Sequence, residues 1–323
     1  MITVLMATLQ GSSYVREQLD SILAQTRPVD RIVISDDGST DGTVEILNEY
    51  RERYPQQVEL ISHSKDGHPD HLTGAAANFL HLIQQEGKLP PSESGYWFLS
   101  DQDDIWMTDK VEKMVGKMTE VEAGVEKGSP ILLYSDLKVV DKNKKMISES
   151  LFSYQHMSPE RVEFSEVLVE NPVTGGAAMF NRALLELVSE PPVSCMMHDW
   201  WLALAASSFG SIICLEEPLG LYRQHGKNVM GAKKTGSLTD LIQRMNRSNE
   251  VEENYRRMFE QAECFLMQYG SRMNETDRRA VQAFLSLKLR GPIRRFGAIR
   301  KHSLYKTSLL QTLAQCFTIR QGE

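Results

Sequence analysis

Short apolar runs alternate with amphipathic stretches through the first 140 residues of the chain. The apolar runs have the length and the β-branched and aromatic content of buried strands, and they lie at 2–9, 31–35, 57–62, 96–100 and 131–140. Between them, apolar residues recur at helical spacing over 14–26, 42–53, around 79–83 and over 108–122. This alternation predicts an α/β fold with an open, mostly parallel sheet flanked by helices.

The second half of the chain is less regular. The stretch "NPVTGGAAMF" (171–180) predicts a Gly-Gly loop and a short apolar run, 198–215 predicts a helix and then a strand, and 222–231 predicts a polar loop. From about residue 236 onward the pattern is helical, with a break at Gly291-Pro292. We therefore expect a first domain over residues 1–230 and a helical C-terminal region over 231–323.

Composition places the chain among ordinary globular proteins, with 323 residues, 41% hydrophobic and 24% charged. The four cysteines lie far apart without metal-type spacing, and we expect reduced core thiols at Cys195, Cys214, Cys264 and Cys316. The sequence shows no signal peptide and no run near the ~18–20 apolar residues of a membrane span. These features predict a cytoplasmic location and leave open a peripheral attachment to the cytoplasmic face of a membrane.

The net charge of −7 hides a basic tail on an acidic body. Residues 278–322 hold ten Lys or Arg and no Asp or Glu, which leaves 26 basic and 43 acidic residues elsewhere, a formal charge of −17. Within the tail, helical spacing puts Leu309, Leu313, Cys316 and Phe317 on one face. The tail is therefore suited to an anionic inner leaflet, to packing on the body, or to a second subunit; the acidic body disfavours nucleic acid.

Carboxylates cluster directly after two of the expected strands. Asp101, Asp103 and Asp104 follow the strand with three aromatic residues, and Asp36 and Asp37 follow the strand at 31–35. In open α/β sheets, ligands bind beyond the carboxyl ends of strands. An Asp-X-Asp pair can hold Mg²⁺ together with a diphosphate. The alternatives are a solvated acidic loop for the first cluster and a capped turn for the second.

Three further motifs carry candidate chemistry. Asp199 opens an apolar helix and could act as a general base, although a helix cap explains it as well. Gly175-Gly176 permits close approach of a ligand, or forms a plain turn. Trp200 could pack against a sugar face, whereas we expect Trp201 in the core. Arg223 and His225 offer a cation for phosphate and an imidazole ligand.

Taken together, these motifs resemble those of a family 2 glycosyltransferase with the GT-A fold. The matching pieces occur in order over about residues 2–230: "TVLMATLQG", "YVREQLDSILAQT", "IVISDDGSTDGT", "LSDQDDIW", "TGGAAMFNR", "HDWW" and "YRQHGKNV". The likeness is greatest to the rhamnosyltransferase-like branch of bacterial surface polysaccharide synthesis. By this resemblance the sheet is Rossmann-like, and the helical C-terminal region is an extension of the GT-A domain.

The resemblance also implies a role for each candidate residue. Asp199 is the catalytic base, and the metal, Mg²⁺ or Mn²⁺, is held by Asp103, with Asp101 and His225 beside it. The donor nucleotide contacts Thr8, Asp36, Asp37, Asp101 and Arg223. The donor sugar and the acceptor lie against Gly175, Gly176 and Trp200.

The activity implied is inverting, metal-dependent transfer of a sugar from a nucleotide donor to a hydroxyl of a growing, lipid-linked cell-surface glycan. The first expectation for the donor is dTDP-L-rhamnose, with UDP-sugars as the other class. Leu9 and Gln10 depart from the family, which has Tyr-Asn there, so stacking on the base is lost. The alternative is a non-catalytic module that binds sugar nucleotides or glycans; a nucleotidyltransferase is disfavoured, and the sequence leaves a homo-oligomer open.

Overall fold

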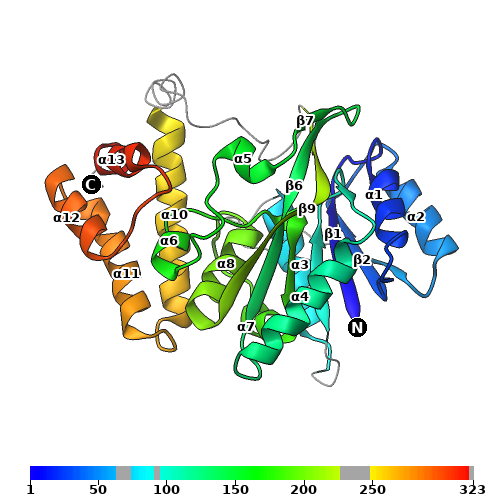
Figure 1. Ribbon diagram of the computed structural model, residues 1–323, viewed down its shortest axis with the longest axis horizontal. Coiled ribbons are helices and arrows are strands. Elements are labelled where there is room, and N and C mark those ends of the chain that lie inside the picture. Colours follow the sequence, from blue (N-terminus) through cyan, green and yellow to red (C-terminus); the bar gives the residue numbers. More distant parts are fainter. Residues whose placement is uncertain (63–73, 91–94, 226–247, 320–323) are drawn as a thin grey trace.

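The computed structural model describes residues 1–62, 74–90, 95–225 and 248–319. The histidines at 63, 68 and 71, which the sequence places in a polar loop, lie outside the described residues, and so does the expected domain boundary at 230–231. Figure 1 shows one central sheet with α1 and α2 at one end of the molecule and the C-terminal helices at the opposite end.

One sheet of nine strands organises the described residues, in the order β3-β2-β1-β4-β8-β6-β9-β5, with β7 paired to β6. The strands are β1 (Ile2–Thr8), β2 (Arg31–Asp36), β3 (Val58–Ser62), β4 (Tyr96–Ser100), β5 (Ile105–Trp106), β6 (Ile131–Asp141), β7 (Met146–Ser148), β8 (Ala178–Asn181) and β9 (Ser211–Gln224). Strands β1 to β4 run parallel, β8 is antiparallel to both β4 and β6, and β6 pairs in parallel with β9. The expected mostly parallel sheet with flanking helices is confirmed.

Two layers of helices cover the two faces of the sheet. One face packs on α1 (Val15–Leu23), α2 (Thr43–Arg53) and α4 (Lys110–Gly124), and the other on α3 (Gly74–Gly87), α7 (Arg182–Val188) and α8 (His198–Phe209). Side chains alternate along β1, so Leu5 enters one core while Val4 and Met6 enter the other. Smaller pieces are α5 (Leu151–Gln155), α6 (Phe164–Val167), η1 (Gly175–Ala177) and η2 (Leu287–Leu289).

The C-terminal region is helical, as the sequence predicts, and consists of α10 (Ser248–Tyr269), α11 (Glu275–Ser286), α12 (Pro292–Lys301) and α13 (Leu309–Thr318). It packs on the sheet domain through aromatic residues: the ring centroids of Trp201 and Phe265 lie 5.3 Å apart, and those of Trp201 and Tyr269 5.9 Å apart. Trp201 is fully buried, which confirms its expected place in the core. The predicted break at Gly291-Pro292 is also present, with Pro292 as the first residue of α12.

Two segments differ from the expectations. Residues 222–224 belong to β9 and not to a polar loop, because Val139, Val140 and Asp141 of β6 pair with them. In α13, Cys316 is buried while Leu309 and Phe317 are exposed, so the expected shared face does not include Cys316.

All four cysteines are free thiols, and two of them are buried. No helix within the described ranges has the length and apolar composition that crossing a membrane requires.

Candidate functional site

The carboxyl ends of β1 and β2 hold the first pair of candidate residues. Thr8 and Asp36 lie in register, and the Thr8 hydroxyl donates a 2.7 Å hydrogen bond to Asp36 Oδ2. Asp36 also accepts hydrogen bonds from the Gly38 and Ser39 backbone N–H groups and from the Ser39 hydroxyl. The Asp36 side chain therefore stabilises the turn after β2. The backbone N–H of Asp37, the next residue, donates a hydrogen bond to the Thr8 carbonyl.

Gln102 joins this turn to the carboxylate loop. The backbone N–H of Leu9 donates to Gln102 Oε1 at 2.9 Å, and Gln102 Nε2 donates to the Leu9 carbonyl at 2.8 Å. A Cβ on Gly11 would lie 2.2 Å from Gln102 Oε1, so the glycine leaves the space that this pair of bonds needs. The central residue of the Asp-X-Asp sequence thus fixes the loop to the end of β1.

Asp103 faces His225 across the site. The Asp103 Oδ2 and His225 Nε2 atoms lie 2.7 Å apart, and the His225 ring stacks on Tyr14 with ring centroids 4.7 Å apart. Both side chains are mostly shielded from solvent. The structure therefore brings together the carboxylate and the imidazole for which the sequence predicts metal binding.

Asp101 and Asp104 are crowded carboxylates. Burial raises the pKa of Asp104 well above its ordinary range, and the Asp103 and Asp101 charges raise it further. Burial also raises the pKa of Asp101, helped by Asp103 and Asp199 and opposed by Lys110 and a Gly176 backbone hydrogen bond. Asp104 Oδ2 is buried and has no hydrogen-bond partner within the described part of the chain. Such a group favours a cation or a proton at this place.

Lys110 supplies a buried positive charge next to these carboxylates. Its side chain is fully buried, its Nζ donates a 2.8 Å hydrogen bond to the Gly176 carbonyl, and it lies 4.2 Å from the Trp106 ring centroid. Burial lowers the pKa of Lys110, whereas the charges of Asp104 and Asp101 oppose this shift. The ammonium thus joins the first turn of α4 to the Gly-Gly loop.

The Gly175-Gly176 loop lies directly against charged side chains. A Cβ on Gly176 would lie 2.8 Å from an oxygen of both Asp101 and Asp104, and a Cβ on Gly175 would lie 2.9 Å from His198 Nε2. Real Cβ atoms essentially never approach so closely. The sequence predicts that a ligand approaches the backbone of this loop closely. In the structure the carboxylates of Asp101 and Asp104 lie that close to it, and contact with the donor sugar or the acceptor stays a prediction.

Asp199 is held rigidly at the start of α8. Its Oδ2 accepts from the Gly175 N–H at 3.0 Å, and its Oδ1 accepts from Asn171 Nδ2 at 3.1 Å and from the Trp200 N–H at 2.7 Å. Burial raises the pKa of Asp199 to about 6, although these hydrogen bonds oppose the shift. Part of its surface remains accessible. A partly accessible carboxylate with a pKa near neutrality is suited to accept a proton.

The two neighbours of Asp199 in sequence are core residues. Trp200 is 9% exposed, and its indole N–H donates to the Val167 carbonyl at 2.7 Å. Its ring therefore packs in the core beside α6, and a contact with a sugar stays a prediction. His198 is also buried, and its ring stacks on Phe79 with centroids 4.0 Å apart; burial lowers its pKa to about 3, so it is neutral.

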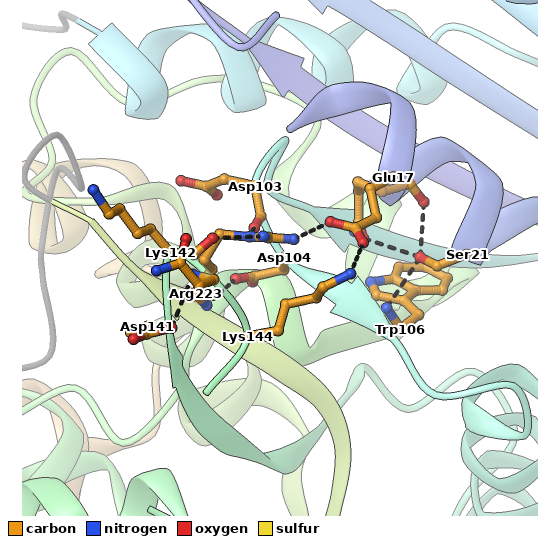
Figure 2. A network of polar contacts seen from close by, with 11 residues as sticks. Glu17, Ser21, Asp103, Asp104, Trp106, Asp141, Lys142, Lys144 and Arg223 are labelled. Atoms are coloured by element: carbon orange, nitrogen blue, oxygen red, sulfur yellow. Dashed lines mark hydrogen bonds and ion pairs between the residues drawn. The ribbon is translucent and has the colours of Figure 1, made fainter. Parts of the chain in front are cut away.

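Arg223 lies at the centre of a polar network that Figure 2 shows. Its guanidinium pairs with Glu17 of α1, donates to the Asp103 carbonyl at 2.9 Å, and donates to the Lys142 carbonyl at 3.3 Å. Lys144 pairs with the same Glu17 carboxylate. The buried guanidinium therefore supports the backbone of the carboxylate loop, and a direct contact with a diphosphate stays a prediction.

The residues at this site fit a divalent cation that also takes ligands from a substrate. Within the described ranges, no group of three or more His, Cys, Asp or Glu side chains is arranged to hold an ion by itself. Mg²⁺, however, is usually bound by one or two carboxylates together with phosphate oxygens. Asp103 and His225, whose side chains meet at 2.7 Å, provide such a partial set.

Three of the residues that build the site had no role assigned to them from the sequence. Asp104 and Lys110 surround the Gly176 loop, and Glu17 pairs with Arg223. Lys110 did carry a signal, because a lysine in the first turn of a helix opposes the helix dipole and so indicates nearby negative charge. Glu17 carried none, since it looks like any charged residue on the outer face of a helix.

Comparison with known proteins places the chain in a family. The model of glycosyl transferase family 2 matches residues 3–188. The chain is 30% identical over 233 residues to dTDP-rhamnosyl transferase RfbG of Shigella flexneri, covering 70% of this chain and 74% of that protein. It is 23% identical over 252 residues to the putative teichuronic acid biosynthesis glycosyltransferase TuaG of Bacillus subtilis, covering 76% and 90%.

Solved structures show the same fold. S. aureus TarS 1-349 in complex with UDP-GlcNAc superposes with a TM-score of 0.51 at 17% identity, covering 93% of this chain and 89% of that one. GalNAc-T7 with UDP, GalNAc and Mn²⁺ superposes with a TM-score of 0.53 at 11% identity, covering 95% and 55%. At such identities the likeness concerns the fold, and it confirms the GT-A architecture.

Proposed function

The chain belongs to glycosyl transferase family 2, and we propose that it is an inverting glycosyltransferase in which Asp199 is the catalytic base. The observation that carries this proposal is the setting of Asp199. Three hydrogen bonds fix its carboxylate beside the Gly175-Gly176 loop, and burial raises its pKa to about 6. A module that only binds sugar nucleotides needs no such base.

The reaction is a single displacement at the anomeric carbon. Asp199 accepts the proton of an acceptor hydroxyl as the hydroxyl oxygen forms its bond to the anomeric carbon. The bond from that carbon to the nucleoside diphosphate breaks on the opposite face, and the diphosphate leaves with the electron pair. A transition state with oxocarbenium character is expected, as in other glycosyl transfers.

Asp103 and His225, with Asp101 and Asp104 nearby, are the residues that would hold Mg²⁺ or Mn²⁺. When bound, such an ion stabilises the negative charge that builds on the departing diphosphate. A Mn²⁺ ion in a structure of the same fold supports this assignment. The Asp103–His225 contact holds the two side chains at one place before a donor enters.

The donor nucleotide lies, in this proposal, across the carboxyl ends of β1 and β2, with Thr8, Asp36 and Asp37 at the base and ribose and Arg223 toward the diphosphate. Leu9, where the family has an aromatic residue, is 44% exposed beside this turn. An aliphatic side chain offers the base apolar contact in place of ring stacking. Gly175 and Gly176 border the sugar and the acceptor.

For the substrates, we propose L-rhamnose from dTDP-L-rhamnose as the donor and a lipid-linked, growing cell-surface glycan as the acceptor. The printed name of the Shigella flexneri relative supports the donor, and the name of the Bacillus subtilis relative supports a cell-envelope polysaccharide. UDP-sugars form the second donor class to test.

A thermal-shift screen tests the proposal. Nucleoside diphosphates and sugar nucleotides are added with and without Mn²⁺ or Mg²⁺, and the unfolding temperature is measured. The donor that stabilises the protein is then mixed with acceptor glycans, and release of the nucleoside diphosphate is measured. A ligand at 100 times its Kd adds about 2.7 kcal/mol of stability. Metal-dependent stabilisation by dTDP-rhamnose followed by transfer is the expected result. Binding without any turnover would favour the non-catalytic module. No response to any nucleotide would contradict the transferase and would favour a module that binds glycans.

A further inference from the structure

The last helix of the described chain carries its apolar residues on the outside. In α13, Thr312, Gln315 and Cys316 are buried, whereas Leu309, Leu310 and Phe317 are 69%, 54% and 72% exposed. A helix that only packs on the protein body shows the opposite arrangement. In α12, which packs on α13, Ile293 is 90% exposed.

This concentration of apolar side chains is particular to the tail. Of the thirteen large hydrophobic side chains exposed in the described part of the chain, seven lie between residues 289 and 317. They are Leu289, Ile293, Phe296, Leu309, Leu310, Leu313 and Phe317, and we call them the tail apolar surface. The other six are scattered over 9–267. Exposed apolar residues in such a group mark an interaction surface.

The orientation of α13 is fixed by polar contacts on its inner side. The buried Arg295 donates to the Leu287 carbonyl at 2.8 Å and to the Cys316 carbonyl at 2.9 Å. The Lys306 N–H donates to the Thr312 hydroxyl at 3.0 Å, and the Thr307 N–H donates to Glu170 at 2.7 Å. Turning the leucines inward would break these contacts, so the fold holds the apolar side toward solvent.

The helices that carry the tail apolar surface are also basic. Arg294, Arg300 and Lys301 of α12 are exposed, and no acidic residue occurs from 278 to 322. Burial lowers the pKa of His302, and the charges of Lys301, Arg290 and Arg279 lower it further. Apolar side chains beside a cluster of cations match a bilayer with an anionic surface and an apolar interior.

Other occupants of this surface fit less well. Residues 226–247 contain five Lys or Arg and one Asp, so this segment would bring like charge to a basic surface. Two copies meeting through their tails would also bring basic groups together. A tail on the acidic body of a second copy would meet only the scattered apolar side chains described above.

We propose that α12 and α13 form a docking surface for a membrane of anionic phospholipid, with the tail apolar surface inserted among the headgroups and acyl chains. The inference goes beyond the proposed transfer reaction, because it concerns helices that are separate from the site. Such docking would bring the protein to an acceptor carried by a lipid.

The test is vesicle flotation of the full chain at low salt. Phosphatidylcholine vesicles with and without phosphatidylglycerol serve as probes. We expect the protein to float only with phosphatidylglycerol. Leu309→Ser/Leu310→Ser/Phe317→Ser should weaken the partition coefficient by at least about tenfold, because bound apolar area is lost. Arg294→Gln/Arg300→Gln/Lys301→Gln should weaken it by roughly fivefold for each charge removed.

Control variants change exposed apolar residues and exposed cations elsewhere on the protein. Val193→Ser/Met267→Ser removes two exposed apolar side chains, and Arg51→Gln/Lys127→Gln/Lys145→Gln removes three exposed cations. Both should float like the wild type. All variants must unfold at the wild-type temperature, which is expected because the altered side chains are exposed.

Three results would overturn the proposal. In the first, the wild-type protein does not float with phosphatidylglycerol vesicles. In the second, the apolar triple variant floats like the wild type. In the third, light scattering shows a wild-type dimer, the apolar triple variant is a monomer, and neither protein binds vesicles. The last result would assign the surface to a second copy. Nucleotide-induced thermal shifts of the same samples are independent of flotation, so a failure of docking and a failure of the proposed function can be distinguished.

Discussion

The Lys110 ammonium donates a 2.8 Å hydrogen bond to the Gly176 carbonyl and thereby joins α4 to the loop that faces Asp101 and Asp104. The carboxylate loop, the Gly-Gly loop and the start of α4 come from different parts of the chain, and this buried cation lies where they meet. Its positive charge lowers the pKa values of the two carboxylates that burial raises. Lys110 is therefore a positioning residue of the site.

Lys110→Met should lower the stability of the protein by about 1–3 kcal/mol, because the Gly176 carbonyl loses its buried donor. Asp104→Asn removes one of the charges that Lys110 compensates. We therefore expect the Lys110→Met/Asp104→Asn variant to be more stable than the two single losses added together, with a coupling of roughly 0.5–3 kcal/mol. Denaturant unfolding of the four proteins measures this. Lys117→Met is the control: this lysine lies on the same helix but is partly exposed, so its loss should change the stability little. If the stability losses of Lys110→Met and Asp104→Asn simply added up in the double variant, Lys110 would not have this role.

Gly176→Ala should damage both stability and transfer. The new Cβ would lie 2.8 Å from carboxylate oxygens of Asp101 and Asp104, so the loop or the carboxylates must move. Overpacking of this kind costs about 1–3 kcal/mol. Gly116→Ala is the control, because nothing lies within 4 Å of its Cβ position on α4 and alanine favours a helix by up to about 1 kcal/mol. Equal unfolding temperatures for the two variants would contradict the packing described.

Asp199→Asn should reduce turnover by ~10²–10⁴-fold and retain donor binding, because the variant cannot accept the proton. A small loss of stability is also expected. Both carboxylate oxygens accept hydrogen bonds from N–H groups, and the asparagine NH₂ must face one of these donors. Steady-state transfer assays and donor titrations measure the two effects. Asp277→Asn, which changes a half-buried carboxylate on α11 that accepts hydrogen bonds from Ser208 and Asn274, is the control. Unchanged turnover in Asp199→Asn would exclude it as the base.

The pH dependence of transfer should follow the same carboxylate. With a pKa of about 6, Asp199 is ionised above pH 6 and protonated below it. The rate constant kcat should therefore be level near neutral pH and fall about tenfold per pH unit once the pH is well below 6. An Asp with an ordinary pKa near 3.8 would leave kcat level down to about pH 5. Rates between pH 4.5 and 8 at saturating donor, with unfolding temperatures at each pH, distinguish the two cases.

Much of the sheet domain follows from local pattern. Strands β1 to β4 and helices α1 to α4 have clear periodicity, and parallel strands bring their carboxyl ends to one edge, so Thr8, Asp36 and Asp101 could be placed together. The antiparallel insertion of β8 between β4 and β6 depends on long-range pairing that no local pattern shows.

Side-chain burial was harder to predict than strand order. Helix α8 is apolar on all sides, which indicates burial of the whole helix and could have placed Trp200 in the core. Lys110 looks like a surface residue, because its burial depends on carboxylates from another loop. In α13 the spacing of apolar residues identified an amphipathic helix, but only tertiary contacts such as Arg295 with the Cys316 carbonyl determine which side faces the body.

Asp103→Asn should abolish the metal-dependent part of donor binding. Asp103 and His225 are the residues that would hold the ion, and an amide is a weaker ligand for a hard cation than a carboxylate. Thermal shifts with dTDP, with and without Mn²⁺, should differ for the wild type and coincide for Asp103→Asn. Glu126→Gln, an exposed carboxylate after α4, should behave like the wild type. If Asp103→Asn kept a metal-dependent shift equal to that of the wild type, the ion would have to be held elsewhere, and the contact between His225 and Asp103 would be a structural one.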